Sequence, residues 1–288
     1  MHYSARWSWY GAILFGILIA ATDPVSVIAT FKEIGVHGRL RLLVEAESLF
    51  NDGIAAVAFS AALVFVMDEN LTVSGVGWTL VTSIVGGILC GTIITWGVLL
   101  LAGRTTDHLT EVTLTTVATY GSFLLAERLH LSGVFASLTA ALIVGNAGFL
   151  WSIYSREAVE SFWEYAAFVA NAFIFDLIGI RTGKQHFASI APLIPVAVAI
   201  TLLAHALAIY PCCALFRRSA LRVEPRQQHI LFWGGLRGAL ALALALGLPA
   251  GLPQREEIIT TAFVIVAFSI FTQGLTMPPL LRRLGEIP

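Results

Sequence analysis

The chain has 288 residues, of which 57% are hydrophobic and 12% are charged. Soluble domains carry about 25% charged residues, so this composition indicates a protein whose solvent is lipid. The formal net charge is −1, and the 17 Lys and Arg are scattered through short polar segments, which excludes the basic face that nucleic-acid binding requires. We therefore expect an all-α integral membrane protein that contacts membrane lipid and binds no nucleic acid.

Polar breaks divide the sequence into nine candidate transmembrane segments, because a spanning helix needs about 20 apolar residues. The first is expected to be interrupted. The segments cover residues 8–35, 43–67, 74–102, 109–128, 131–149, 158–180, 188–216, 228–248 and 257–277.

Lys and Arg fall mostly on alternate loops between these segments, and such loops favour the cytoplasm. With an odd number of segments, the N-terminus is then outside and the C-terminus is cytoplasmic. We expect one multi-pass transmembrane domain over residues 1–288, located in the cell membrane.

The first segment contains the sequence AATDPVSVIATF, in which Pro24 disfavours helical geometry at Asp23. The helix should therefore break in mid-membrane, beside the polar groups of Thr22 and Asp23. A break exposes backbone carbonyls and helix ends, which coordinate ions in transporters. The alternative is an ordinary proline kink.

The second segment opens with VEAESLFNDGIAAVAF, which places several polar side chains in an apolar helix. Ser48 and Asp52 lie four residues apart and share one face, and Glu47 and Asn51 form a neighbouring stripe. Glu45 lies closer to the interface, where we expect it to be solvated.

Asp52 is the candidate for the central functional group of this segment. An intramembrane carboxylate costs about 2.5–3.5 kcal/mol, so it is expected to have a functional reason. A desolvated carboxyl group can hold a proton or a cation, but not both. That competition is a minimal mechanism for exchanging one for the other.

The eighth segment reads HILFWGGLRGALALALALGLP, where Gly234, Gly235 and Gly238 surround Arg237. Glycines there loosen the helix or allow another backbone to approach closely. Arg237 requires a carboxylate or free carbonyls as partner, unless it reaches the interface as a snorkelling side chain.

Two further titratable residues stand alone in apolar segments. Asp176 lies in NAFIFDLIGIR, where a structural role is favoured, and His205 lies in ITLLAHALAIYP, where its role stays open. The sequence contains no HExxH metal motif and no GxSxG nucleophile motif, so we expect neither an enzyme nor a cofactor.

The motifs ATDPVSVIATFKEIGV and ESLFNDG resemble those of the cation:proton antiporter-1 family, the NhaP-type sodium/proton exchangers. The resemblance continues through LLAERLHLSGVFASLTAALIVGN, FWEYAAFVANAFIFDLIGI, WGGLRGALALALALGLP and FTQGLTMPPLLRRLG, in the same order along nearly the whole chain.

This resemblance implies an inverted-repeat antiporter fold in which two discontinuous helices cross at mid-membrane. Residues 8–67 would be a remnant of the first repeat, 74–102 a linker helix, and 109–277 the second repeat.

The resemblance also implies roles for individual residues. Thr22, Ser48 and Asp52 would bind Na⁺, with Asp23 beside them and Asn51 in support, and one cation would be exchanged per proton. Glu47 would make a structural ion pair with His205, which replaces the family's arginine and would make the pair pH-sensitive. Arg237 would take part in the same ion-pair or pH-tuning group.

By the same resemblance, about four helices of the first repeat are expected to be absent, and with them much of the surface of a homodimer. The leading hypothesis is a secondary active transporter that exchanges Na⁺ or Li⁺, with K⁺ as a further candidate, for protons. The alternative is a transport-inactive, truncated or partner-dependent membrane protein of the same family.

Overall fold

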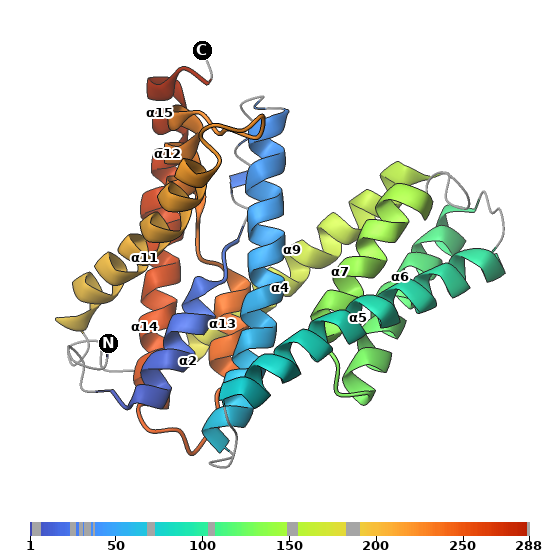
Figure 1. The fold of residues 1–288 in the computed structure, drawn as a ribbon, viewed down its shortest axis with the longest axis horizontal. Helices are drawn as coiled ribbons and strands as arrows, with labels where there is room; N and C mark the ends of the chain where they lie inside the picture. Colours follow the sequence, from blue (N-terminus) through green and yellow to red (C-terminus); the bar gives the residue numbers. More distant parts are fainter. Residues whose placement is uncertain are drawn as a thin grey trace. The chain divides into compact units, whose positions relative to one another are not determined.

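The structure, a computed structural model, describes residues 1, 7–23, 27, 28, 31, 36, 38–67, 73–102, 107–148, 155–182 and 191–286. The chain falls into two compact units, Met1–Ala55 with Ile174–Pro288 and Ala56–Phe173. The regular structure over the described residues is helical (Figure 1). It consists of α2 (Trp9–Ala20), α4 (Arg39–Met67), α5 (Val73–Ala102), α6 (His108–Arg128), α7 (Gly133–Ile143), the π-helical turn η1 (Val144–Gly148), α9 (Arg156–Thr182), α11 (Leu193–Leu215), α12 (Pro225–Gly234), α13 (Ala239–Leu246), α14 (Arg255–Phe268), the π-helical turn η2 (Ser269–Gly274) and α15 (Leu275–Leu284).

Most predicted segments form helices that suit a membrane. Within the described residues, six are long and apolar enough to cross one: Arg39–Val66, Gly77–Leu101, Arg156–Ile180, Leu193–Leu215, Pro225–Leu246 and Arg255–Leu284. Trp9–Ala20 and Gly133–Ala147 are apolar but shorter. The segment predicted at 109–128 forms α6, whose threonine-rich sequence leaves it outside this group. The prediction of an all-α, multi-pass membrane protein is confirmed.

Two of the helical segments are interrupted. α2 ends at Ala20, and residues 21–23 leave the helix just before Pro24, which itself lies outside the described residues. The eighth predicted segment is divided into α12 and α13 by the non-helical residues 235–238. Both interruptions fall where the sequence places a proline or a cluster of glycines.

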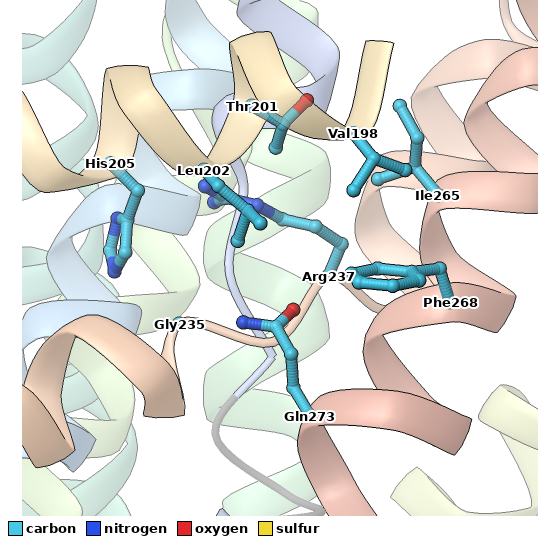
Figure 2. A pocket seen from close by; sticks show the side chains of 9 residues that line it. All are labelled: Val198, Thr201, Leu202, His205, Gly235, Arg237, Ile265, Phe268 and Gln273. Carbon is cyan, nitrogen blue, oxygen red and sulfur yellow. The ribbon is translucent and has the colours of Figure 1, made fainter. Parts of the chain in front are cut away.

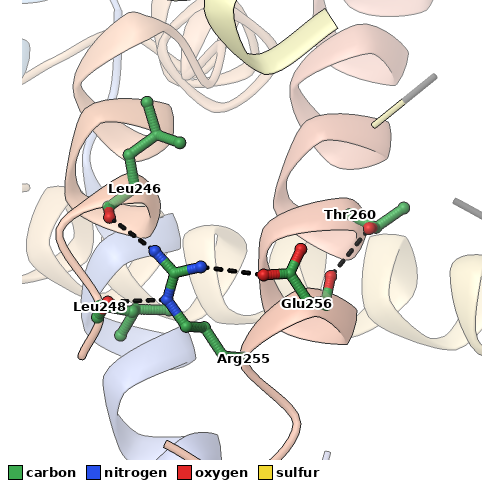
Figure 3. Close-up of polar contacts among 5 residues, drawn as sticks. All are labelled: Leu246, Leu248, Arg255, Glu256 and Thr260. Atoms are coloured by element: carbon green, nitrogen blue, oxygen red, sulfur yellow. Dashed lines mark hydrogen bonds and ion pairs between the residues drawn. The ribbon is translucent and has the colours of Figure 1, made fainter. Parts of the chain in front are cut away.

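The short half-helix α13 is held at its C-terminal end by Arg255 (Figure 3). The Arg255 guanidinium donates to the carbonyl oxygens of Leu246 and Leu248 at 3.0 and 2.7 Å, and pairs with Glu256 at 2.9 Å. The last carbonyls of a helix have no partner inside it, and a cation there also suits the helix dipole. Arg255 therefore fixes α13 to the start of α14.

An apolar core joins the start of α4 to α12 and α15 in the first unit. Its buried members include Leu40 and Val44 on α4, and Met277 and Leu281 on α15. Ile230 and Leu231 extend it along α12, just before the interruption. The α12 side of the second interruption is therefore packed against α4 and α15.

In the second unit, glycines allow α5 to pack closely on the start of α7. A side chain at Gly87 would overlap the Ser132 carbonyl oxygen, and one at Gly91 would overlap that of Ala136. Because both neighbours are backbone atoms, they cannot move aside as a flexible side chain would. The two glycines fix the distance between these helices.

Replacing Gly87 or Gly91 with alanine is expected to lower the thermal stability of the detergent-solubilised chain, because overpacking costs about 1–3 kcal/mol. Gly97→Ala is the matched control: it lies on the same helix, and its added methyl group meets nothing within 4 Å. Alanine favours a helix over glycine, so the control should keep or raise the melting temperature. Equal melting temperatures for all three variants would contradict the packing.

Candidate functional site

Three of the predicted site residues meet where α4 passes the end of α2. The Asn51 Nδ2 donates to the Ala20 carbonyl oxygen at 2.6 Å and to Thr22 Oγ1 at 3.1 Å. The backbone amide of Thr22 donates to Asp52 Oδ1 at 3.1 Å. The first interruption is therefore bound directly to the Asn-Asp pair of α4.

Arg237 reaches the same place from the second interruption. Its Nη1 donates to the Ala20 carbonyl oxygen at 2.6 Å and to that of Ala21 at 3.4 Å, and the residue is 5% exposed. Of the partners considered for Arg237, the structure thus supplies free carbonyls at a helix end, and the side chain does not snorkel. A buried guanidinium requires such acceptors because an unpaired charge in this setting is costly.

The two non-helical segments also touch through their backbones. The Asp23 amide donates to the Leu236 carbonyl oxygen at 2.7 Å. A side chain at Gly238 would overlap the Asp23 side chain, so glycine is needed for this approach. The two interruptions therefore cross in contact, with Asp23 at the crossing.

The charges around the crossing are predominantly negative. The charge of Arg237 acts on both Glu47 and Asp52, and the Asp23 charge acts on Asp52. Among the described residues, Glu47 and Asp52 thus interact with one guanidinium, and Asp23 adds a third carboxyl group beside Asp52. With all three ionised, the group carries excess negative charge, which a bound cation or proton can reduce.

Ser48 lies one turn before Asp52 on α4 and is fully buried. Its hydroxyl donates to Glu47 Oε2 at 3.3 Å. This contact leaves the hydroxyl oxygen available as an acceptor or ligand. Glu47 and Ser48 thus form a polar pair beside the Asn51–Asp52 pair.

The expected ion pair between Glu47 and His205 does not form among the described residues. The His205 Nε2 instead lies 3.4 Å from the Leu231 carbonyl oxygen, and its ring stacks on Phe232 with centroids 6.1 Å apart. The physical reason is the interruption after Gly234, which deprives the last carbonyls of α12 of helical partners. His205 faces one of these carbonyls, and Gln273 donates to another, that of Trp233, at 3.2 Å.

A small cavity lies beside Arg237, lined by residues from α11, the second interruption, α14 and η2 (Figure 2). Its volume of about 10 Å³ is close to the space that one water molecule needs. Thr201, His205, Arg237 and Gln273 supply its polar groups, and Val198, Leu202, Ile265 and Phe268 supply apolar walls.

Two residues of this region were not predicted from the sequence. Ser269 Oγ accepts from the Arg237 amide at 2.9 Å and lies 3.0 Å from the Arg237 carbonyl, so it clamps the backbone of the interruption. Gln273 caps α12 as described above. Ser269 and Gln273 lie four residues apart in an apolar segment, and both side chains are buried. This spacing of two polar residues is the sequence pattern from which they could have been predicted.

Comparison with known proteins assigns the chain to a family. The family model described as "Sodium/hydrogen exchanger, transmembrane" matches residues 1–283. The chain belongs to this family. It is 39% identical over 280 residues to the Na(+)/H(+) antiporter ApNhaP of Aphanothece halophytica, covering 96% of this chain and 54% of that protein. It is 36% identical over 293 residues to the Na(+)/H(+) antiporter NhaG of Bacillus atrophaeus, covering 98% of this chain and 55% of that protein.

The fold is shared with a solved relative. The sodium proton antiporter MjNhaP1 from Methanocaldococcus jannaschii superposes with a TM-score of 0.75 at 21% identity, covering 99% of this chain and 74% of that one. The predicted antiporter fold and the NhaP-type family are therefore confirmed. The chain spans about half the length of the first two relatives that it matches.

The contact between His205 and the interruption can be tested with a double substitution. Gly235→Ala is expected to lower the melting temperature, because a side chain at Gly235 would overlap the His205 ring. Adding His205→Ala to that variant should recover part of the loss. Gly179→Ala, where nothing lies within 4 Å, is the control. Strictly additive effects of the two substitutions would show that the ring does not pack on Gly235.

Proposed function

We propose that the chain exchanges a monovalent cation, Na⁺ or Li⁺ with K⁺ as a further candidate, for protons, and that Asp52 carries either the cation or the proton. The observation that carries this proposal is the position of Asp52. One of its carboxylate oxygens binds the Thr22 amide at the first interruption, beside the point where Asn51 and Arg237 share the Ala20 carbonyl.

The cation would be bound by oxygen atoms around Asp52. Thr22 Oγ1, Ser48 Oγ and the Asp52 carboxylate are the proposed ligands, with Asp23 adding negative charge nearby. Interrupted helices are suited to this role because their backbone is not fully hydrogen-bonded within the helix. Protonation of Asp52 removes the charge that holds the cation, so the two substrates compete for one group.

Neighbouring residues would position Asp52 and limit the charge that accumulates there. Asn51 holds the end of α2 against α4 through its two hydrogen bonds. Arg237 offsets part of the negative charge of Asp52 and Glu47. One cation per proton is the proposed stoichiometry, since one carboxyl group alternates between them. In this scheme His205 tunes the site through the backbone around Arg237, without direct contact to Glu47.

A second candidate function is that of a transport-inactive chain, or one that works only with a partner. The observation in its favour is the share of the relatives' length that this chain spans, which is about half. The curated relatives whose names state Na(+)/H(+) antiport are correspondingly longer. Transport by this chain alone distinguishes the two functions.

Asp52→Asn is expected to abolish cation-induced proton movement in everted vesicles from an antiporter-deficient host. The asparagine amide neither takes up a proton in the range where a carboxyl group does nor carries negative charge. The control is Asp176→Asn, an exposed acid in the last third of α9, which should leave activity unchanged. Immunodetection of each inserted variant in the same membranes accounts for expression.

Activity retained in Asp52→Asn would contradict the proposed role of Asp52. If the unsubstituted chain is inserted in the membrane but gives no signal with Na⁺, Li⁺ or K⁺, the second candidate function is favoured.

A further inference from the structure

One end of the first unit is rich in arginine. Eight of the 17 basic residues of the chain lie at the start of α4, in and after the loop between α11 and α12, and at the end of α15. They are Arg39, Arg41, Arg217, Arg218, Arg222, Arg226, Arg282 and Arg283.

Hydrogen bonds join these three regions. Arg39 donates to the carbonyl oxygens of Leu221 and Arg222 at 2.7 and 3.0 Å, which fixes the loop to the start of α4. Arg226 donates to the Leu284 carbonyl oxygen at 3.4 Å, which joins the start of α12 to the end of α15. Figure 1 shows the loop between α11 and α12 reaching the upper end of α4, beside α12 and α15.

Five of these arginines have exposed side chains without a carboxylate partner among the residues that the structure describes. They form what we call the arginine surface: Arg217, Arg218, Arg222, Arg282 and Arg283. At the same end, Glu45 is already paired with Arg41 at 2.7 Å, which leaves Glu224 and Glu286 as the nearby described acids. The arginine surface thus carries excess positive charge.

Exposed apolar side chains lie within this surface. Leu215 and Phe216, at the end of the membrane-length helix α11, are 80% and 44% exposed, and Leu221 in the following loop is 65% exposed. Alternation of exposed apolar and cationic side chains at the end of a spanning helix suits the interface, where acyl chains meet phosphate groups. In water, the exposure of Leu215, Phe216 and Leu221 would be unfavourable.

We propose that the arginine surface binds the headgroups of anionic phospholipids, with Leu215, Phe216 and Leu221 against the adjoining acyl chains. The residue type supports this ligand. The planar guanidinium of arginine binds phosphate oxygens in pairs. The bound lipid would stabilise the end of the unit that joins α4, α12 and α15.

Native mass spectrometry of the detergent-purified chain provides the test, with phosphatidylglycerol and phosphatidylcholine of identical acyl chains as probes. Each interfacial arginine is worth about fivefold in affinity for an anionic lipid. The unsubstituted chain should therefore bind phosphatidylglycerol at least about fivefold more tightly than phosphatidylcholine. Arg217→Gln/Arg218→Gln should lower that preference severalfold, with the remaining three arginines keeping part of it, and should leave phosphatidylcholine binding unchanged.

Two further variants make the result specific. Arg128→Gln/Arg156→Gln, which removes the same charge from other helix ends, should keep the preference. Arg282→Gln/Arg283→Gln should weaken it and serves as the test if the first pair fails to fold. The proposal is overturned if the unsubstituted chain binds both lipids equally, if the glutamine variants keep the full preference, or if inorganic phosphate displaces phosphatidylglycerol, since the surface would then be a site for free anions.

Discussion

The carbonyl oxygen of Ala20 accepts two hydrogen bonds, from Asn51 on α4 and from Arg237 in the second interruption, both at 2.6 Å. It is the last carbonyl of α2 and has no helical partner of its own. In a membrane every such group must be satisfied within the protein, because lipid offers no hydrogen bonds. The crossing of the two interruptions meets this requirement, and it brings a guanidinium and two carboxyl groups to one place.

Neither the acids nor the arginine would be stable here alone. A charge in the middle of a membrane helix costs about 2.5–3.5 kcal/mol, and Arg237 is almost fully buried. The carbonyls of α2, the clamp from Ser269 and the charges of Glu47 and Asp52 together offset that cost. Because two carboxyl groups interact with one guanidinium and Asp23 adds a third negative charge beside Asp52, the charge balance is left incomplete. In the proposed mechanism, a proton or a cation completes it, and this is why the site can exchange one for the other.

The sequence predicts most of the helices because length and continuity of apolar runs are local properties. It also predicts the interruptions, since Pro24 and the glycines around Arg237 act on their own backbone. Thr22, Asn51 and Asp52 could be chosen from their cost in an apolar segment, and the structure brings them together. Their roles stay predictions.

The partner of His205 could not be predicted in the same way. Its contact with the Leu231 carbonyl arises only because α12 ends three residues later, and local sequence does not say which helix lies opposite that end. Ser269 was missed for a similar reason, because its partner is the backbone of Arg237, 32 residues away. Tertiary contacts of backbone groups leave little trace in side-chain patterns.

Competition between a cation and a proton at Asp52 is the central claim, and it can be measured without a membrane gradient. Na⁺ or Li⁺ is added to the purified chain in weakly buffered detergent solution, and released protons are followed with a pH indicator. The account predicts one proton released per cation bound, and no release from Asp52→Asn. Cation binding to the unsubstituted chain without proton release would contradict it.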